Sequence, residues 1–332
     1  MGADVKQVET RTVAPEDAET RLDRWFKRHY PGLAFGRVAK LLRTGQVRVD
    51  GKRAKANQRL STGQEIRVPP LPADAAQTET PDRQTATSDP RIVEQIRDAI
   101  VYCDDWVLAL NKPPGIASQG GTQVRDHIDG LSDALRFDAA EPPKLVHRLD
   151  KDTSGLLLLG RSAQAAARLG QAFRTKDARK IYWALTAGIP KPRTGLIDRP
   201  LAKRKRGGGE KMDETPSGKP AQTAYVVITT AKPGIAWVAL SPLTGRTHQL
   251  RAHMALLGTP VLGDGKYGGA AAFPKNRNID NLHLHAWEIA LPHPDDGTTL
   301  RLTAPLPDHM ATSFAQLEFD AVWGEDIDPA GR

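Results

Sequence analysis

Residues 71–90 interrupt the hydrophobic patterning of the chain and divide it into two parts of unequal length. The segment is rich in Pro, Thr, Ala and acidic residues, and it has neither a helical nor a strand period. This composition is typical of an extended linker, and a surface loop packed on a single domain is the alternative. We therefore expect an N-terminal tail over 1–18, a small domain over 19–70, a linker over 71–92 and a larger domain over 93–325.

The surplus of positive charge is concentrated in the small domain. The chain has 47 Lys and Arg residues against 39 Asp and Glu, a formal net charge of +8, and residues 19–70 alone hold 13 basic and 4 acidic residues. Such an excess indicates an acidic partner: nucleic acid, anionic lipid or a phosphorylated ligand. The single cysteine, Cys103, excludes an internal disulfide framework and a zinc site built on several cysteines.

The sequence contains no segment suited to a membrane or to secretion. Its longest apolar runs, such as 156–159, are far shorter than the roughly 18–20 residues that cross a bilayer. The N-terminus carries Asp4 and Glu9 and lacks the apolar stretch of a secretory signal. We expect a cytoplasmic protein without membrane contact.

Residues 19–70 combine one helical pattern with short strand patterns. Apolar residues recur at helical spacing over 35–42, and Gly45 stands where such a helix would end. The Asp-Gly pair at 50–51 is a strong signal for a two-residue hairpin, and 65–68 reads as another short strand. The expected fold of this part is a small α+β module.

Three basic residues recur every three positions along the expected helix: Arg37, Lys40 and Arg43. This spacing places them on one face. A stripe of charge is often no more than a solvated face. Here the large local excess of basic over acidic residues favours a surface that contacts phosphates.

The longer part of the chain alternates strand and helix patterns. Strand patterns occur at five places: 106–110, 156–159, 181–187, 223–230 and 235–240. A first helix is expected after Ser162 as N-cap, and a second after Thr247 as N-cap, ended by Gly258 and Pro260.

The densest polar segment, 147–155, precedes the apolar run at 156–159. It brings two carboxylates, two cations, an imidazole and two hydroxyls into nine residues. Loops at strand ends are where reactive side chains sit on a rigid scaffold. The residues alone leave two interpretations open: a reactive site, or a charged turn in which Asp152 or Thr153 caps backbone groups.

A second polar segment covers 243–253. His248 and Arg251 are three positions apart on the expected helix and share a face beside its apolar stripe. An arginine placed there could pair with an aspartate from elsewhere and keep it ionised as a nucleophile. The alternative is a surface arginine on an ordinary helix.

Two further features carry weaker signals. His283 and His285 alternate along an expected strand, but no third ligand has suitable spacing, so we expect no metal site. The basic run 203–206 and the glycines at 207–209 predict a flexible basic loop, which either reaches phosphates or is simply solvated.

Four motifs in one order carry a resemblance to a known family. They are Asn-Lys-Pro-Pro-Gly at 111–115, His-Arg-Leu-Asp-Lys-Asp-Thr-Ser-Gly at 147–155, Lys-Ile-Tyr at 180–182, and Gly-Arg-Thr-His-Gln-Leu-Arg-Ala-His at 245–253 followed by Gly-Asp-Gly-Lys-Tyr-Gly at 263–268. Together they resemble the RluA-type RNA pseudouridine synthases.

The N-terminal block is similar to an S4-type RNA-binding domain, with Gln-Val-Arg-Val-Asp-Gly-Lys at 46–52 as its hairpin. The whole arrangement is most similar to the RluC-like branch, which modifies large-subunit ribosomal RNA, and the RluD-like branch is the nearby alternative. The resemblance implies an α+β protein. In it, a small S4-like module is joined by a linker to a mixed, largely antiparallel β-sheet catalytic domain with flanking helices and loops.

The resemblance also implies roles in catalysis. Asp150 takes the position of the catalytic aspartate, and Arg251 that of the basic residue that pairs with it. Tyr182 takes the position of the active-site tyrosine, which lies near the base and is a candidate proton acceptor. No cofactor and no metal are implied.

RNA contacts are expected from several basic residues. Arg148 matches the arginine that fills the gap left by a flipped-out nucleotide, and His147 beside it helps hold the RNA. Arg246 and His248 are assigned to RNA binding as well, together with the stripe described above: Arg37, Lys40 and Arg43.

The chemistry of the residues agrees with an isomerase. Turning uridine into pseudouridine breaks an N–C bond and forms a C–C bond within one nucleotide, for which one carboxylate is sufficient, acting at C1′ or at C6. A glycosidase would use two carboxyl groups, and Asp152 is the only close candidate for a second. The expected function is isomerisation of specific uridines in 23S ribosomal RNA by a monomer, acting on RNA that can lie within the assembling large subunit. A non-catalytic ribosomal RNA-binding or assembly protein and a synthase acting on transfer RNA are the alternatives.

Overall fold

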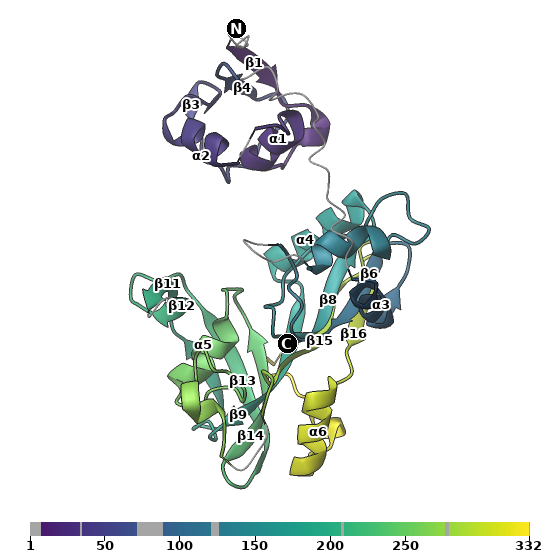
Figure 1. The fold of residues 1–332 in the computed structure, drawn as a ribbon, viewed down its shortest axis with the longest axis vertical. Helices are drawn as coiled ribbons and strands as arrows, with labels where there is room; N and C mark the ends of the chain where they lie inside the picture. Colours follow the sequence, from purple (N-terminus) through teal and green to yellow (C-terminus); the bar gives the residue numbers. More distant parts are fainter. Residues whose placement is uncertain are drawn as a thin grey trace. The chain divides into compact units, whose positions relative to one another are not determined.

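The computed structural model describes residues 8–33, 35–71, 89–120, 126–206, 209–275 and 279–331. The chain divides into two units, Met1–Thr87 and Ser88–Arg332, each of which is described by itself (Figure 1). Most of the expected linker, 72–88, lies outside the described residues. No helix within the described ranges is long and apolar enough to cross a membrane.

The first unit is a small sheet with two helices. Its elements are β1 (Glu9–Thr12), α1 (Leu22–His29), α2 (Phe35–Arg43), β2 (Arg48–Val49), β3 (Lys52–Arg53) and β4 (Glu65–Val68), with a 3-10 turn at Pro15–Asp17. The strand order is β1-β4-β2-β3. The expected helix, hairpin and final strand are confirmed, and both residues of the Asp50-Gly51 turn have positive φ, as a type I′ turn requires.

The expected N-terminal tail is too long. Residues Glu9–Thr12 pair with β4 in antiparallel register, and Val13 and Asp17 are buried. Short alternating segments of four residues carry a weak strand signal. The edge of the sheet supplies the hydrogen-bond partners that make this segment a strand.

The second unit contains the larger sheet. Its strands are β5 (Ile100–Cys103), β6 (Val107–Lys112), β7 (Lys144–Leu145), β8 (Ser154–Gly160), β9 (Arg179–Ala187), β10 (Thr194–Asp198), β11 (Leu201–Arg206), β12 (Gly209–Glu214), β13 (Gln222–Ala231), β14 (Ile235–Pro242), β15 (Leu284–Pro292) and β16 (Thr299–Thr303). Its helices are α3 (Pro90–Asp98), α4 (Ala163–Thr175), α5 (Gln249–Leu256) and α6 (Asp308–Leu317), with 3-10 segments at Ile128–Leu135, Gly269–Ala272 and Ala321–Gly324.

The ten-stranded sheet runs in the order β10-β13-β14-β9-β15-β8-β6-β5, with β16 paired to β15 and β7 to β8. Every pairing in it is antiparallel except β15 with β8. The expectation of a mixed, largely antiparallel sheet with flanking helices is therefore confirmed.

The apolar run at 156–159 is buried on both faces of β8, as expected. Leu157 and Leu159 pack with Leu131 on one face, and Leu156 and Leu158 pack with α4 on the other. This two-sided burial explains why the run is continuous rather than alternating. Ser162 caps α4 as expected, because its side chain accepts a hydrogen bond from the Ala165 N–H.

Two expectations are wrong in this unit. The basic segment expected as a flexible loop forms β11 and pairs with β12 as a two-stranded ribbon, although Gly207 and Gly208 lie outside the described residues. The helix expected to be capped by Thr247 begins at Gln249 with His248 as the N-cap residue.

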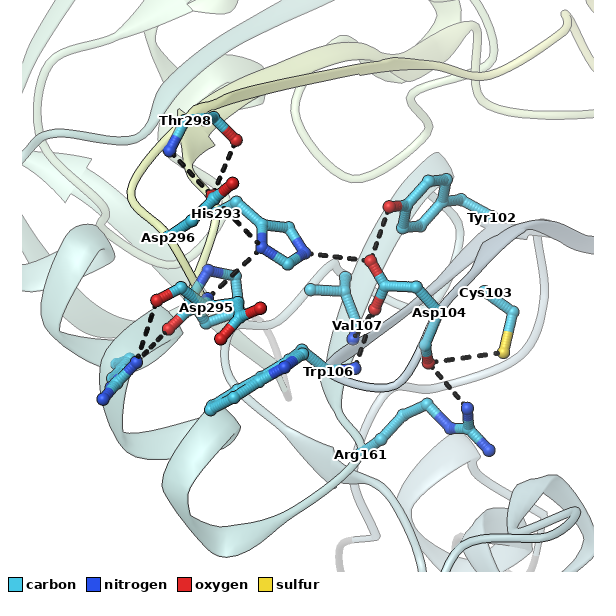
Figure 2. Close-up of polar contacts among 12 residues, drawn as sticks. Tyr102, Cys103, Asp104, Trp106, Val107, Arg161, His293, Asp295, Asp296 and Thr298 are labelled. Atoms are coloured by element: carbon cyan, nitrogen blue, oxygen red, sulfur yellow. Dashed lines mark hydrogen bonds and ion pairs between the residues drawn. The ribbon is translucent and has the colours of Figure 1, made fainter.

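Polar contacts fix the turns at one end of the sheet. The Asp104 carboxylate lies 2.5 Å from the Tyr102 hydroxyl and 2.9 Å from Nε2 of His293, and its other oxygen accepts the backbone N–H groups of Trp106 and Val107 (Figure 2). These contacts join the β5–β6 turn to the segment after β15. They make that end of the sheet a rigid scaffold.

Candidate active site

Asp150 lies in the turn that leads directly into β8. The Thr153 N–H donates to the Asp150 carbonyl at 3.2 Å, which closes the turn. The next residue, Ser154, lies with its hydroxyl 2.9 Å from Nδ1 of His285 on β15. At Gly155, which has a φ of +104°, a Cβ would collide with the backbone of Ala286. The half-buried Asp150 is thus carried by a turn whose exit is fixed on the sheet.

Lys112 holds the other side of this turn. Its fully buried ammonium donates to the carbonyls of Pro113, Ile116 and Lys151 at 2.8, 2.9 and 3.0 Å. Burial lowers the pKa of Lys112 to about 7, opposed by the nearby negative charge of Asp152 and Asp150. Three acceptors match the three N–H groups of an ammonium. The opening motif therefore serves to anchor the turn that carries Asp150.

Tyr182 reaches the same place from β9. It pairs with Ala286 of β15, and Ala286 pairs with Gly155 at the start of β8, so one row across three strands relates the tyrosine to the Asp150 turn. Burial raises the pKa of the Tyr182 hydroxyl, and the negative charge of Asp150 raises it further. The phenol is therefore protonated at neutral pH and lies within the field of Asp150.

The expected pairing of Arg251 with Asp150 is wrong. The Arg251 guanidinium instead donates two hydrogen bonds to Asp264, at 2.8 and 2.7 Å, and both side chains are buried. Asp264 is held in place by the N–H groups of Lys266 and Tyr267. A buried guanidinium needs a buried counter-charge with good geometry, and Asp264 supplies it.

Arg251 still acts on Asp150 through space. Burial would lower the pKa of Arg251, but the hydrogen bonds and charge of Asp264 raise it, with a smaller contribution from Asp150. The carboxylate of Asp150 thus interacts electrostatically with the Arg251 guanidinium, whose hydrogen bonds go to Asp264 instead. That arrangement leaves its oxygens accessible for a reaction.

His248 faces Asp150, with its Nε2 3.8 Å from Oδ2 of the aspartate. Its other nitrogen, Nδ1, lies 3.0 Å from the Tyr267 hydroxyl. Burial lowers the pKa of His248, opposed by the charge of Asp150. The histidine assigned from the sequence to RNA binding therefore faces the aspartate.

The other expected RNA contacts differ in their surroundings. Arg148 is exposed beside Asp150, and the exposed Arg37, Lys40 and Arg43 share a face of α2 in the first unit. Arg246 is half-buried and donates from Nε to the Pro220 carbonyl at 3.0 Å.

His147 is used by the scaffold. Its Nε2 accepts the Leu158 N–H at 2.9 Å and its ring stacks on Phe173 at 4.4 Å. Burial lowers the pKa of its imidazole to about 3, with a contribution from the charge of Lys180. A neutral ring that is already hydrogen-bonded is poorly suited to holding a phosphate, so the geometry gives His147 a structural task.

Three residues of this site carry no role in the sequence interpretation: Lys112, Asp264 and Tyr267. All three lie in the motifs quoted above, so their positions were visible but their contacts were not. One signal was available for Asp264, since a buried arginine requires an acidic partner and Asp264 stands in a motif soon after the helix. The two alternating histidines are each hydrogen-bonded on both ring nitrogens. His283 contacts the Asn281 carbonyl and the Ser313 hydroxyl. His285 contacts the Ser154 hydroxyl and the Ala304 carbonyl.

Comparison with known proteins places this geometry in a family. Residues 106–256 match the RNA pseudouridylate synthase family. The chain is 36% identical to a protein of Rickettsia typhi named ribosomal large subunit pseudouridine synthase C, over 86% of this chain and 94% of that protein. It is 33% identical to a Vibrio cholerae protein of the same name, over 94% of this chain and 97% of the relative.

Solved structures agree. Human RNA pseudouridylate synthase domain containing 4 superimposes with a TM-score of 0.56 at 28% identity, covering 69% of this chain and 97% of that one. The resemblance drawn from the motifs is thus confirmed for the family, and the match includes Asp150, Tyr182 and Arg251 within 106–256. The chain belongs to the RNA pseudouridylate synthase family.

Proposed function

We propose that this RNA pseudouridine synthase isomerises uridines in large-subunit ribosomal RNA, with Asp150 as its catalytic carboxylate. The observation that carries the proposal is the convergence of Asp150, Tyr182 and Arg251 from the turn before β8, from β9 and from α5. The negative charge of Asp150 contributes to raising the pKa of both Tyr182 and Arg251. The choice of RNA is supported by the two bacterial relatives, which are named for the large ribosomal subunit and align over most of this chain.

The reaction needs one ionised carboxylate beside the nucleotide. It breaks the bond between uracil N1 and ribose C1′, turns the base within the site and joins C5 to C1′, after which C5 loses its proton and N1 carries one, so that the product is an isomer of the substrate. Asp150 is suited to attack the nucleotide or to stabilise its cationic sugar, and the guanidinium of Arg251 interacts with it through space. Tyr182, protonated and adjacent, is suited to donate a hydrogen bond to the departing base, and becomes a proton acceptor only after giving up that proton.

The surrounding carboxylates favour isomerisation over hydrolysis. Asp152 is exposed, and Asp264 is fully engaged by Arg251. A glycosidase needs a second carboxyl group set to activate water at a defined distance from the first. Asp264 is occupied by Arg251, and the exposed Asp152 side chain has no hydrogen bond with the described residues that would hold it at such a distance, so the site is better suited to retaining the base than to releasing it.

RNA engagement is assigned to two places. Arg148, exposed beside Asp150, fills the space that the target uridine leaves when it turns out of its stack, which offsets part of the few kcal/mol that flipping costs. The first unit, with its α2 stripe and its hairpin at 50–51, serves as an S4-like RNA-binding module. Because one chain supplies the whole catalytic set, we also propose that the protein works as a monomer, in the cytoplasm, on free or assembling large-subunit RNA.

The test is conversion of unmodified large-subunit ribosomal RNA by purified protein, read by carbodiimide labelling and primer extension. Wild-type protein is expected to give discrete new stops. Asp150→Asn should give none while its RNA affinity stays within a few-fold. Asp152→Asn, which changes an exposed carboxylate two residues away, is the matched control and should keep the stops.

Three outcomes would overturn parts of this proposal. Full activity of Asp150→Asn would remove the aspartate from its role. Stops on transfer RNA but none on ribosomal RNA would transfer the activity to the other substrate. Tight RNA binding with no conversion of either RNA would favour the non-catalytic alternative.

A further inference from the structure

A chain of three polar groups runs from Asp150 to the β11–β12 ribbon. Nε2 of His248 faces the Asp150 carboxylate at 3.8 Å, and Nδ1 lies 3.0 Å from the Tyr267 hydroxyl. The same hydroxyl oxygen accepts the backbone N–H of Met212 on β12 at 3.0 Å. None of the roles assigned above to the catalytic residues uses His248, Tyr267 or this contact.

One of the two hydrogen bonds at the Tyr267 hydroxyl has a fixed direction. The Met212 N–H can only donate, so the Tyr267 oxygen is an acceptor there and keeps its own proton to give. Nδ1 of His248, 3.0 Å away, is placed to accept that proton. A neutral imidazole that accepts at Nδ1 carries its proton at Nε2, which is the nitrogen that faces Asp150.

From this geometry we infer that His248 is a positioning residue, held by Tyr267 as the Nε2–H tautomer so that it orients the Asp150 carboxylate for reaction. This inference rests on the proposed role of Asp150. The gap of 3.8 Å is longer than a hydrogen bond. Hydrogen bonds in an empty catalytic site are often long and shorten once substrate is bound, and a bound nucleotide pressing on Asp150 would close this one.

The surroundings of the pair fix its orientation. His248 precedes α5 with a left-handed backbone, at a φ of 50°, and its side chain makes no capping hydrogen bond to the helix. The Tyr267 ring packs edge-on against the imidazole, with centroids 5.7 Å apart, and the Arg251 guanidinium lies 5.3 Å from the centre of the same ring. The Tyr267 ring that contacts His248 therefore also packs on Arg251, which is hydrogen-bonded to Asp264.

The alternative for His248 is the direct RNA contact expected from the sequence. The two roles predict different kinetics. A residue that contacts RNA alters affinity or KM, whereas one that orients Asp150 alters the rate of the chemical step and leaves affinity nearly unchanged.

The first test is single-turnover kinetics with saturating enzyme and ribosomal RNA, combined with affinity measurements. We expect His248→Ala to lower the rate constant roughly 100-fold, the order that misplacing a reacting group by about 1 Å can cost, with affinity changed less than threefold. His248→Gln, which restores an N–H donor, should recover at least a tenth of the wild-type rate. Thr247→Ala, an exposed neighbour outside the site, is the matched control and should match wild type in both measurements.

Tyr267→Phe tests the tautomer. It keeps the ring that packs on Arg251 but removes the hydroxyl that donates to Nδ1. In wild-type protein labelled with ¹⁵N-histidine, the His248 signals, assigned by their loss in His248→Gln, should be those of an Nε2–H imidazole. In Tyr267→Phe they should move toward a mixture of both tautomers, and the single-turnover rate should fall while affinity is kept.

Two results would overturn the inference: an Nδ1–H tautomer in wild-type protein, or a His248→Ala variant that loses affinity and keeps its rate. The histidine spectrum is recorded on the free protein and needs no turnover. Conversion by wild-type protein is measured first. A failure of the proposed function is thereby distinguished from a failure of the His248 role. Thermal melts of each variant identify any that do not fold, and the Gln and Phe variants retain the packing volume.

Discussion

At the scale of single residues, buried polar side chains surround the turn that carries Asp150. Lys112 fixes three carbonyls around it, Arg251 is neutralised by Asp264, and His285 anchors Ser154 at its exit. A buried polar group that loses its partner costs about 1–3 kcal/mol. The contacts of Lys112 and His285 therefore resist movement of the turn that carries Asp150 more than a surface ion pair could.

The buried histidines give the fold a predictable acid sensitivity. His285 is fully buried between Ser154 and Ala304, and burial lowers its pKa to about 4, as it does for His283. In the unfolded chain these two histidines take up protons near pH 6.5, whereas in the folded chain they do so only at about pH 4. Stability is therefore full above pH 6.5 and falls as the pH drops toward 4, by about 1.4 kcal/mol per pH unit for each such group.

Urea unfolding at pH 7, 6 and 5 measures this effect. Wild-type protein should lose stability at each step. His285→Gln, which cannot titrate, should start less stable but lose less between pH 6 and pH 5, and His283→Gln should behave in the same way. Equal losses in wild type and both variants would show that these histidines are not the groups responsible.

At the scale of elements, the candidate active site depends on how strands and one helix meet. β9, β15 and β8 lie side by side, and the row from Tyr182 through Ala286 to Gly155 carries the tyrosine toward the Asp150 turn. Helix α5 packs against β13 and β14, so that Leu250 and Met254 bury their side chains while Arg251 reaches Asp264. The site is therefore shared among elements distant in sequence and cannot form before the sheet does.

Helix α2 carries a prediction of its own. Val38, Leu41 and Leu42 are buried, whereas the stripe is exposed: Arg37, Lys40 and Arg43. Replacing the three stripe residues by Ala should leave the melting temperature nearly unchanged and weaken binding to ribosomal RNA. The slope of log affinity against log salt should become shallower by roughly 2–3, at about 0.7–0.9 per lost phosphate contact.

The matched control replaces three exposed cations of the second unit by Ala. They lie in the turns after β9 and before β14: Lys191, Arg193 and Lys232. It makes the same change in net charge, so it should change the salt slope much less. If both triple variants changed the slope equally, net charge rather than the α2 face would be responsible for binding.

At the scale of the whole molecule, each unit buries a core of its own. The first unit encloses Trp25, Phe26 and Tyr30 with the apolar residues of α2 and β4. The second encloses an aromatic cluster around Trp183, Trp237 and Phe314, together with the two faces of β8. Separate cores allow separate folding.

Deleting residues 1–88 should therefore leave a second unit that unfolds cooperatively, since Asp89, which caps α3, is retained. Affinity for ribosomal RNA should fall on the order of 100-fold, the scale on which linking two binding modules raises affinity. Conversion of a short RNA containing the target uridine should persist. A second unit that fails to fold, judged by circular dichroism and thermal melting, would contradict the division into two units.

Much of the fold could be predicted from local patterns. The helix and hairpin of the first unit, the buried strand at 156–159, the Ser162 cap and the strands at 181–187 and 235–240 all depend on periodicity or on turn chemistry within a few residues. The prediction was wrong where the signal was short or ambiguous. β1 has only four alternating residues, and the basic run of β11 looks like a loop until β12 pairs with it.

The sequence by itself determined the family and the candidate site residues, because the motifs around Asp150, Tyr182 and Arg251 are contiguous stretches whose residue types can be read directly. Only the tertiary structure decided what each of them touches. Arg251 is hydrogen-bonded to Asp264, His248 faces Asp150, and His147 accepts a hydrogen bond from the backbone of β8. The reason is physical: a periodicity records which face of its own element a residue occupies, whereas a partner is chosen by distances between elements far apart in the chain.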